Sequence, residues 1–440
     1  MISLSIKKTL VVLLAGVLAG FSPSAQAQRN FSLTLARTNQ NGEVLAWQAH
    51  SATPVGDLVL VPQFRVERSP DLRTWTPISG TLTGSVGQML SLVDSNSSRA
   101  FYRVQSIIEK EYAELNGVKL TAGELTGADF FGAKLFGARL DQAALTGANF
   151  SGADLRSADL TQADLRGANL FAVNASSAIF DSGSLASADA AFGDFEAASF
   201  FDVDLTGADF SFSILTGADL DFAIFKQVTL DANTIIDAKP KLIWQIVNQG
   251  AAGATLTNKD LSFASFLDVN FNGARLNGSD FSASDLRRAD VRGANFTLAN
   301  MRFVDFRGTL LDGSTTIDSK SRLVWQILNQ GGAGLDLHST NLSSVWLVGA
   351  NLISANLSNA VCTTSILDEA NLGKANLAKA NCFQATFFQT ILTNANLTQA
   401  LFQSADFTSA NLRNAITNGA NFSGAIFSNT IMPDGSIRNF

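Results

Sequence analysis

One period governs most of this 440-residue chain: leucine or phenylalanine recurs at every fifth residue. Between Leu120 and Leu230 the spacing defines 23 positions, and 21 of them are Leu or Phe, the exceptions being Ala175 and Ala190. We call this position i, and a small residue, usually alanine, stands at i−2. A period of five matches neither the 3.6-residue helix nor the two-residue strand. The chain is therefore built from short repeats, and they decide its architecture.

The repeating units read A-D-L-x-x or A-N-L-x-x, as in ADLRS (153–157), ADLRG (163–167) and ANLFA (168–172). These units resemble the pentapeptide-repeat family. The resemblance implies a right-handed, four-sided parallel β-solenoid in which four pentapeptides form one coil. Positions i and i−2 then point inward, and stacked coils pair their backbones at roughly 4.8 Å. Each buried Leu or Phe should contribute about 1.5–3 kcal/mol.

The repeat breaks twice and resumes each time in a new register. The second register runs from Leu261 to Leu311 and the third from Leu342 to Met432. The two breaks are copies of each other, because TIIDAKPKLIWQIVNQG (234–250) aligns without a gap with TTIDSKSRLVWQILNQG (315–331). We predict that each break forms a short amphipathic helix that leaves the solenoid and returns to it.

The ends and the tryptophans of these helices follow from the same alignment. Asp237 and Asp318 suit the N-cap positions, and a glycine follows each helix. Trp244 and Trp325 stand at equivalent places. Two interpretations are open: the helices pack flat on the solenoid and cover coil edges, or the tryptophans present a binding or self-association surface.

Residues 1–27 have the features of a secretory signal peptide. Lys7 and Lys8 precede an apolar stretch, and Ala25-Gln26-Ala27 forms a cleavage site before Gln28. The apolar stretch is short, and no other stretch approaches the ~20 residues that a membrane span needs. We therefore expect export to the periplasm, the outer surface or the medium, with no membrane span after the signal is removed.

Residues 28–108 lack the five-residue period and alternate like strands. The sequence VERSPDLRTWTPISG…VDSNSSRAFYRV resembles a small β-rich module found in exported bacterial proteins, which implies no reaction. We predict a small β-sandwich-like domain that caps the first solenoid edge.

The predicted fold is all-β, with the solenoid interrupted by two short helical inserts. A Pro-Asp-Gly turn in MPDGSIRNF is expected to close the last coil. The predicted segments are a signal peptide (1–27), the β-rich domain (28–108), a first run of pentapeptides (112–231), a first helical insert (232–255), a second run of pentapeptides (256–312), a second helical insert (313–336), and a third run with its C-terminal cap (337–440).

Charge is distributed unevenly along the chain. The formal net charge is −7, and removing the two lysines of the signal makes it −9. From Glu114 to Asp231 there are 17 acidic and 6 basic residues, and Gly167–Phe225 contains no Lys or Arg. No basic face suits nucleic acid, so we do not expect nucleic acid as a partner.

Residues one coil apart should stack in a column. The spacing therefore predicts a polar ladder at position i−1, made of Asp129, Asn149, Asn169, Asp189 and Asp209. Three interpretations are open: a solvated face that keeps an exported protein soluble, a weak divalent-cation site, or a docking face for a basic protein partner.

Outward-facing phenylalanines add apolar area to this region. Phe171, Phe201, Phe212 and Phe222 all lie outside the inward positions. The candidate interaction surface comprises Asp189, Asp194, Asp209, Asp219, Trp244 and Trp325.

The sequence offers no catalytic or cofactor-binding constellation. Its two histidines, His50 and His338, lie in different regions, and no nucleophile–base arrangement or phosphate loop is present. Cys362 and Cys382 both occupy position i, one coil apart, so a pair of buried thiols and a disulfide are both open. We predict no catalytic residue, no cofactor and no dedicated metal site.

Three functions remain in competition. The first is a non-catalytic exported scaffold that presents the flat faces of a rigid solenoid to a protein partner. The second comes from the resemblance: some pentapeptide-repeat proteins resemble duplex DNA in size and charge and bind DNA topoisomerases. The predicted export and the sparse charge of the third register argue against it. The third is a polysaccharide-active β-helix enzyme, which would need an acid–base cluster that the sequence does not display.

Overall fold

The computed structural model describes nine strands within residues 31–106 and the continuous chain from 113 to 439. The predicted signal peptide, 1–27, lies outside the described residues. No helix in the described part is long and apolar enough to cross a membrane.

The strands within residues 31–106 pair in antiparallel fashion. The first sheet has the order β1-β2-β8, β5 pairs with β6, β7 and β9, and β3 pairs with β4. The bounds are β1 (Phe31–Arg37), β2 (Glu43–Ala49), β3 (Pro54–Val55), β4 (Leu58–Val59), β5 (Gln63–Ser69), β6 (Thr76–Pro77), β7 (Leu82–Thr83), β8 (Met89–Asp94) and β9 (Phe101–Ser106).

From residue 113 the chain forms a four-sided solenoid. Parallel bridges join each coil to the next, so the predicted column Asp129–Asn149–Asn169–Asp189–Asp209 exists as one continuous ladder. Backbone hydrogen bonds follow the same order: the amide of Leu135, for example, donates to the carbonyl of Asp154 at 2.7 Å. The repeat therefore satisfies its backbone polar groups between coils.

The core is a column of position-i side chains flanked by small residues at i−2. Ala175 and Ala190 interrupt the Leu/Phe pattern, yet both are fully buried at inward positions. Phe195 compensates for the small residues around it. A Cβ atom on Gly193 would lie 2.4 Å from the Phe195 ring, so the ring occupies the space that a side chain there would need. The interior thus remains close-packed where the pattern fails.

Two helices interrupt the solenoid: α1 (Ala238–Gln249) and α2 (Ser319–Gln330). Each buries one apolar face, through Ile243 and Ile246 in α1 and through Val324 and Ile327 in α2. Because the buried residues are three apart, they form the single stripe expected of an amphipathic helix.

The two helix N-termini differ. Asp318 accepts a hydrogen bond from the amide of Ser321, as a capping residue should. Asp237 occupies the equivalent position, but its side chain makes no capping bond and instead accepts from the amide of Gly217 in the preceding coil. Asp237 therefore occupies the predicted N-cap position, but its side chain does not cap the helix because a solenoid amide takes its carboxylate.

The coils extend further into the breaks than the pattern indicates. Ala251 is buried at position i, and its amide donates to Asn270 of the next coil at 3.2 Å. The backbone amide of Gly332 likewise donates to the carbonyl of Asn351 at 3.0 Å. Both precede the predicted boundaries, 256 and 337, by one pentapeptide. The sequence pattern was defined by Leu or Phe at position i, and these two pentapeptides have Ala or Gly there, so the pattern does not include them.

The solenoid consists of three sections: a first section (113–236), a second section (251–317) and a third section (332–439). Two-stranded pairs lie where the first and third sections end. β10 (Ile214–Leu215) pairs in parallel with β11 (Ile235–Ile236), and β12 (Thr430–Ile431) pairs in antiparallel fashion with β13 (Ile437–Arg438). The latter hairpin contains the Pro-Asp-Gly turn.

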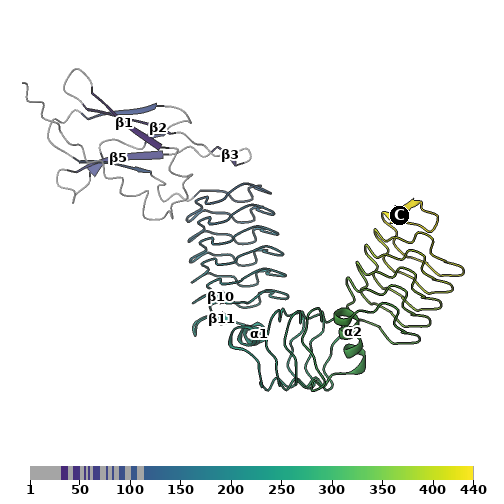
Figure 1. Cartoon of the computed structure of the whole chain (residues 1–440). Helices are drawn as coiled ribbons and strands as arrows, with labels where there is room; N and C mark the ends of the chain where they lie inside the picture. Colours follow the sequence, from purple (N-terminus) through teal and green to yellow (C-terminus); the bar gives the residue numbers. More distant parts are fainter. Residues whose placement is uncertain are drawn as a thin grey trace, which may run out of the picture.

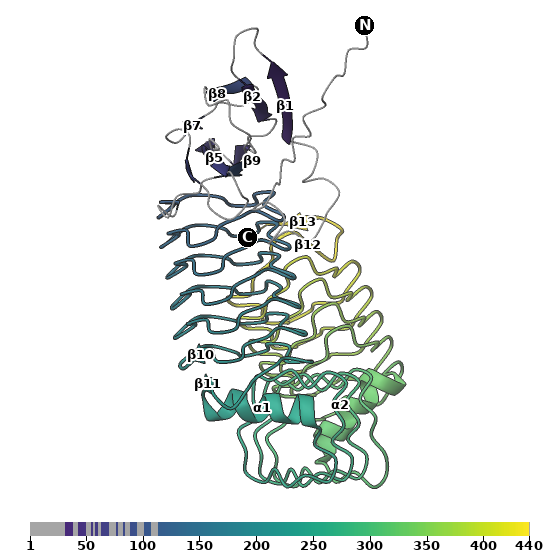
Figure 2. The same ribbon diagram turned by 90° about the vertical axis from the view of Figure 1, so that its left-hand side faces the viewer.

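The three sections are not coaxial. Figure 1 shows that the first section runs down to α1, the second runs across, and the third turns away again at α2. Figure 2, the view turned by 90°, shows the helices at the two bends. The described solenoid is therefore a broad U rather than a straight tower.

Candidate interaction surface

The four aspartates of the candidate surface lie on three consecutive faces of the first section. Asp189 and Asp209 are bridged neighbours in one column. Asp194 belongs to the next column, where it bridges Ile214, and Asp219 belongs to the one after, where it bridges Ser199. The structure brings Asp189 and Asp209 together and places the other two on the next two faces, so these residues occupy three of the four sides of the section.

Each of these aspartates also caps a turn. A carboxylate oxygen at i−1 accepts the backbone N–H of residue i+1, which would otherwise point outward without a partner. The bonds run from Ala191 to Asp189 (3.1 Å), Glu196 to Asp194 (3.1 Å), Ser211 to Asp209 (2.8 Å) and Asp221 to Asp219 (3.0 Å). Asn169 makes the same bond with the amide of Phe171 at 3.0 Å. The turn needs an acceptor oxygen and does not need a negative charge.

Charge compensation changes along the first section. In its earlier coils Arg166 lies two residues after Asp164, and their side chains pair at 2.6 Å. The hydrogen bond from Arg166 lowers the pKa of Asp164 to about 2. Between Gly167 and Phe225 the sequence supplies nine acidic residues and no Lys or Arg. The fold thus leaves this part of the section with negative charge that no basic residue of its own coils offsets.

A stripe of exposed phenylalanines runs beside the Asp189–Asp209 column. Phe171, Phe192 and Phe212 are 42%, 52% and 46% exposed. The Phe192 and Phe212 rings stack in parallel with centroids 4.6 Å apart, and Phe171 lies 5.3 Å from Phe192. We call these three residues the Phe stripe. Sequence reasoning missed Phe192, although its position one coil before Phe212 predicts the stacking.

Two residues of the stripe, Phe192 and Phe212, occupy the left-handed turn position of the repeat. Phe192 and Phe212 both adopt a φ of 60°, in the left-handed region that favours glycine. A bulky residue there costs roughly 1–2 kcal/mol. Because Gly152 at the same corner has a φ of 66° and no side chain to strain, the fold does not require aromatic residues there. The same left-handed φ recurs at this turn position in most pentapeptides, so it belongs to the repeat, and the exposure of the rings is what suggests a role outside folding.

The other two predicted phenylalanines lie on a different corner. Phe201 and Phe222 contact each other edge to face, with centroids 5.4 Å apart, and Phe222 contacts Phe263 of the second section. They therefore belong to the first bend and not to the Phe stripe.

Trp244 and Trp325 anchor the helices to the solenoid. Each is half-buried, and each indole N–H donates at 2.7 Å to a carbonyl of the preceding section, that of Val228 or Thr309. Asn248 and its counterpart Asn329 add a second pair of equivalent bonds. The two bends thus use the same bonding at aligned positions, and this geometry gives both tryptophans a structural role.

No cation site assembles among the described residues, where no group of three or more His, Cys, Asp or Glu side chains is placed to hold a metal. In the predicted ladder the side-chain amide of Asn149 donates to a carboxylate oxygen of Asp129 at 2.8 Å. This bond occupies an oxygen that a cation would need. The divalent-cation interpretation therefore finds no support in this column.

The two cysteines are buried, whereas His338 is exposed. Cys362 and Cys382 are buried free thiols. Hydrogen bonding with Cys362 and burial raise the pKa of Cys382 well above its usual value, so it stays protonated. His338 lies 2.9 Å from the hydroxyl of Ser358 across a coil, and the side chain of His50 lies outside the described residues.

The family pattern described as "Pentapeptide repeats (8 copies)" matches most of the solenoid. The chain belongs to the pentapeptide-repeat family. Its right-handed β-solenoid fold follows from this membership. The matched residues are 113–152, 133–170, 148–185, 194–231, 251–282, 278–313, 336–372, 347–381, 365–403, 380–416 and 405–439.

Several solved pentapeptide-repeat structures are similar to this chain. HetL, a protein involved in heterocyst differentiation regulation from the cyanobacterium Nostoc, is 20% identical over 74% of this chain and 94% of its own, with a TM-score of 0.18. Rfr23 from the cyanobacterium Cyanothece is 31% identical over 22% of this chain and 66% of its own, with a TM-score of 0.22. QnrB1, a plasmid-mediated fluoroquinolone resistance protein, is 19% identical over 49% of this chain and 95% of its own, with a TM-score of 0.16. The comparison with curated proteins gave no match.

Proposed function

We propose that this pentapeptide-repeat protein is a non-catalytic exported scaffold that holds a basic protein partner on its first section. The observation that carries the proposal is a charge that the fold does not need. Asp189, Asp194 and Asp209 cap turns that asparagine caps equally well elsewhere, so their negative charge is available for another purpose.

The Phe stripe gives the same surface an apolar component. Its rings lie at the corner between the face of Asp189 and Asp209 and the face of Asp194. A partner that offers Lys or Arg side chains around an apolar segment would match both features. Such a partner would associate quickly through charge attraction, and the aromatic contacts would slow its release.

Export is the second element of the proposal and depends on the signal peptide predicted at residues 1–27. As part of the same proposal, residues 28–108 form a β-sandwich-like domain that caps the first coil. A scaffold of this kind has no use for a catalytic group, in keeping with a family whose members are generally structural or interaction proteins.

The alternative of a DNA-like inhibitor requires a charged surface that continues along a straight axis. Here the solenoid bends at α1, and the Asp residues of the second section are largely paired with arginines. The remaining alternative, a polysaccharide-active enzyme, has no observation in its favour. We therefore prefer a partner of the first section alone.

A charge-only variant tests the proposal. The triple variant D189N/D194N/D209N keeps an acceptor oxygen at every turn and removes three charges. The control D154N/D159N/D164N removes three charges from earlier coils of the same section, where Asp154 and Asp164 are paired with Arg156 and Arg166. Pull-downs from the exported fraction should recover a basic protein with the wild type and with the control, but not with the first variant. High salt should also release it, because exposed charges are screened within about 8 Å at physiological ionic strength.

The comparison has clear contrary outcomes. Equal loss with both variants would mean that only net charge matters, and retention with both would remove the Asp residues from the interface. Either result would overturn the proposed site.

A further inference from the structure

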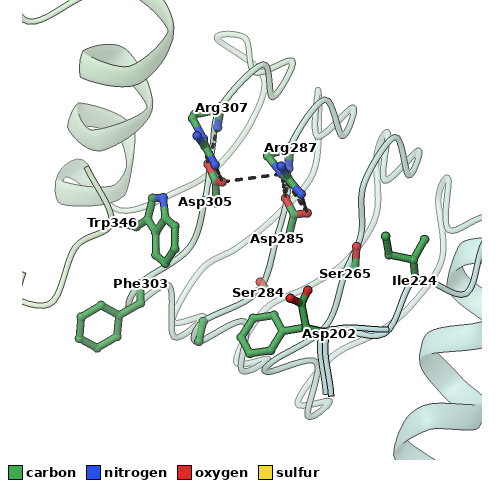
Figure 3. Close-up of a pocket in the computed structure, with 12 residues that line it drawn as sticks. Asp202, Ile224, Ser265, Ser284, Asp285, Arg287, Phe303, Asp305, Arg307 and Trp346 are labelled. Carbon is green, nitrogen blue, oxygen red and sulfur yellow. Dashed lines mark hydrogen bonds and ion pairs between the residues drawn. The ribbon is translucent and has the colours of Figure 1, made fainter. Parts of the chain in front are cut away.

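The two bends create a cleft that no straight solenoid would contain. It has a volume of about 200 Å³ and is lined by all three sections, with Asp202 from the first, Asp285 and Asp305 from the second, and Trp346 from the third (Figure 3). The lining residues come from points far apart in the sequence, and α1 and α2 set the directions that bring them together.

Two stacked Asp–Arg pairs form one side of this cleft. Arg287 binds Asp285, and Arg307 binds Asp305, each through Nε and Nη2, with Nη2–Oδ2 distances of 2.8 and 2.6 Å. Nε of Arg287 also lies 3.8 Å from the carboxylate of Asp305, which joins the pairs into one network. Both pairs hold their planar groups in fixed orientations and still present donors and acceptors to a ligand.

Aromatic rings form the other walls. Phe222 and Phe303 are aligned residues of the two bends, and both line the cleft. They adopt φ angles of 61° and 58°, the left-handed conformation that the repeat uses at this turn position. Trp346 stands at position i−1, where the chain most often has Asp or Asn, and its ring lies beside the Asp305–Arg307 pair (Figure 3).

Asp202 completes the cleft from the first section. Partial desolvation raises the pKa of this otherwise exposed carboxylate, and the positive charge of Arg287 opposes that rise, so the two groups interact across the space. The lining therefore holds three carboxylates and two guanidinium groups, and four of these five are already paired.

The chemistry of the lining restricts the ligand. An anion would have to compete with an existing Asp–Arg pair, at the expense of that pair, and a cation would find only the Asp202 carboxylate outside those pairs. A neutral ligand with many hydroxyl groups can hydrogen-bond to the outer edges of both pairs without breaking them. Its apolar C–H face would pack on the aromatic walls, since aromatic rings offer apolar area with little loss of conformational freedom.

We propose that this cleft binds one pyranose ring of a neutral saccharide. A volume of about 200 Å³ is below that of a pocket for a drug-sized molecule and suits a single sugar ring. The site is separate from the acidic surface of the first section, and it binds without catalysing a reaction. Whether the ring belongs to a free sugar or to the end of a glycan chain is decided by the ligands compared below.

Calorimetric titration of the full chain tests this site. The probes are methyl α-D-glucopyranoside, methyl α-D-galactopyranoside, methyl α-D-mannopyranoside, their trisaccharides, glucose 6-phosphate and a lysine-rich peptide. At least one neutral sugar should bind saturably to one site, with an affinity that changes little with salt. A trisaccharide that binds no tighter than its single ring would identify a one-ring site. Tighter binding of the trisaccharide would extend the site to a glycan end.

Three variants and one control locate the binding. Trp346→Ala should weaken sugar binding about tenfold or more, because it removes the largest of the three aromatic side chains that line the cleft. Asp202→Asn should weaken it about three- to tenfold, because a charged acceptor becomes neutral. Trp346→Phe should retain most of the affinity. Asp159→Asn, three coils before Asp219 in the same column, should leave it unchanged. Asp202 is exposed, so its variant remains informative even if Trp346→Ala fails to fold.

The contrary results are equally definite. The proposal is wrong if no neutral sugar binds at tens of millimolar, or if binding is unaffected by both Trp346→Ala and Asp202→Asn. It is also wrong if the phosphorylated sugar or the lysine-rich peptide takes the cleft in preference to the neutral sugars.

Discussion

The later coils of the first section and the coils of the second section use the same turn with a different neighbour. In both, an Asp at i−1 accepts the backbone N–H of residue i+1. In the second section that residue is often arginine, as in Asp285–Arg287 and Asp290–Arg292, and the side chains pair. In the first section it is Ala191 after Asp189 and Ser211 after Asp209. One residue per pentapeptide therefore decides whether a structural carboxylate remains available to a partner.

The largest expected effect lies in the core, where the two sections should not differ. Phe200 and Phe281 are fully buried at position i. Replacing either by Asp removes a packed ring, which alone costs about 3–5 kcal/mol, and it also buries a carboxylate. Urea unfolding should show a similar and severe loss for both variants, while Phe192→Ser at the exposed stripe should not. Tolerance of one core variant and not the other would show that the two interiors are not equivalent.

The next effect concerns the bends that separate the sections. Trp244→Phe and Trp325→Phe each remove the N–H donated to a solenoid carbonyl. Each should lower the free energy of unfolding by about 1–2 kcal/mol, since a hydrogen bond is lost where the carbonyl is partly buried. Thermal unfolding measures this, and the two losses should match because the two bends share their bonding. Unequal losses would mean that one helix is held mainly by other contacts.

Low pH should change the stability of the second section and of the later coils of the first section differently, by less than the substitutions above. The hydrogen bonds from Arg292 and Arg288 lower the pKa values of Asp290 and Asp268. A lowered folded-state pKa gives stability that is present above the unfolded value of about 3.9 and is lost as the pH falls through the folded value. Desolvation raises the pKa of Asp202 and of Asp221. Protonation of these two groups at low pH therefore opposes the loss of stability.

The unfolding temperature should therefore fall as the pH drops below about 4, and hydrogen exchange should show the second section opening before coils 167–225 of the first section. The variant D268N/D290N should lose part of this acid sensitivity. A wild-type profile that stays flat down to pH 2 would contradict the role assigned to the pairs.

The smallest effect comes from single changes at the turns. Asp209→Asn should shift the free energy of unfolding by less than about 0.5 kcal/mol, because the acceptor oxygen remains, whereas Asp209→Ala should cost about 1 kcal/mol. Asp285→Asn should cost more than Asp209→Asn, because it leaves Arg287 without its charged partner. If Asp209→Asn were as harmful as Asp209→Ala, the charge itself would support the fold.

The sequence predicted the features that depend on spacing alone. The ladder through Asp129 and Asp209, the inward position of Cys362 and Cys382, and the two helical breaks all follow from a fixed period and its interruptions. These features are local, so the residues that make them are related by a constant offset. The bridges between successive coils and the buried thiols follow that rule.

Features that depend on the relative directions of the three sections could not be predicted from the sequence. No spacing relates Asp202, Asp285 and Trp346, since the cleft exists only at the angles set by α1 and α2. The competition of Gly217 for the carboxylate of Asp237 likewise arises from the previous coil. The coils that begin at Ala251 and Gly332 were hidden because their position-i residues are small. The Phe192–Phe212 stacking, by contrast, was readable from the period and was overlooked.

The most direct test of the central claim measures stability and binding on the same proteins. Wild type, D189N/D194N/D209N and the control D154N/D159N/D164N are compared for their unfolding temperature and for their affinity for the captured basic partner at low salt. Our account predicts that the first variant keeps its unfolding temperature and binds the partner at least about tenfold more weakly, as expected when charged contacts are lost. The control should match the wild type in affinity. Undiminished binding by the first variant would contradict the claim that these carboxylates serve a partner.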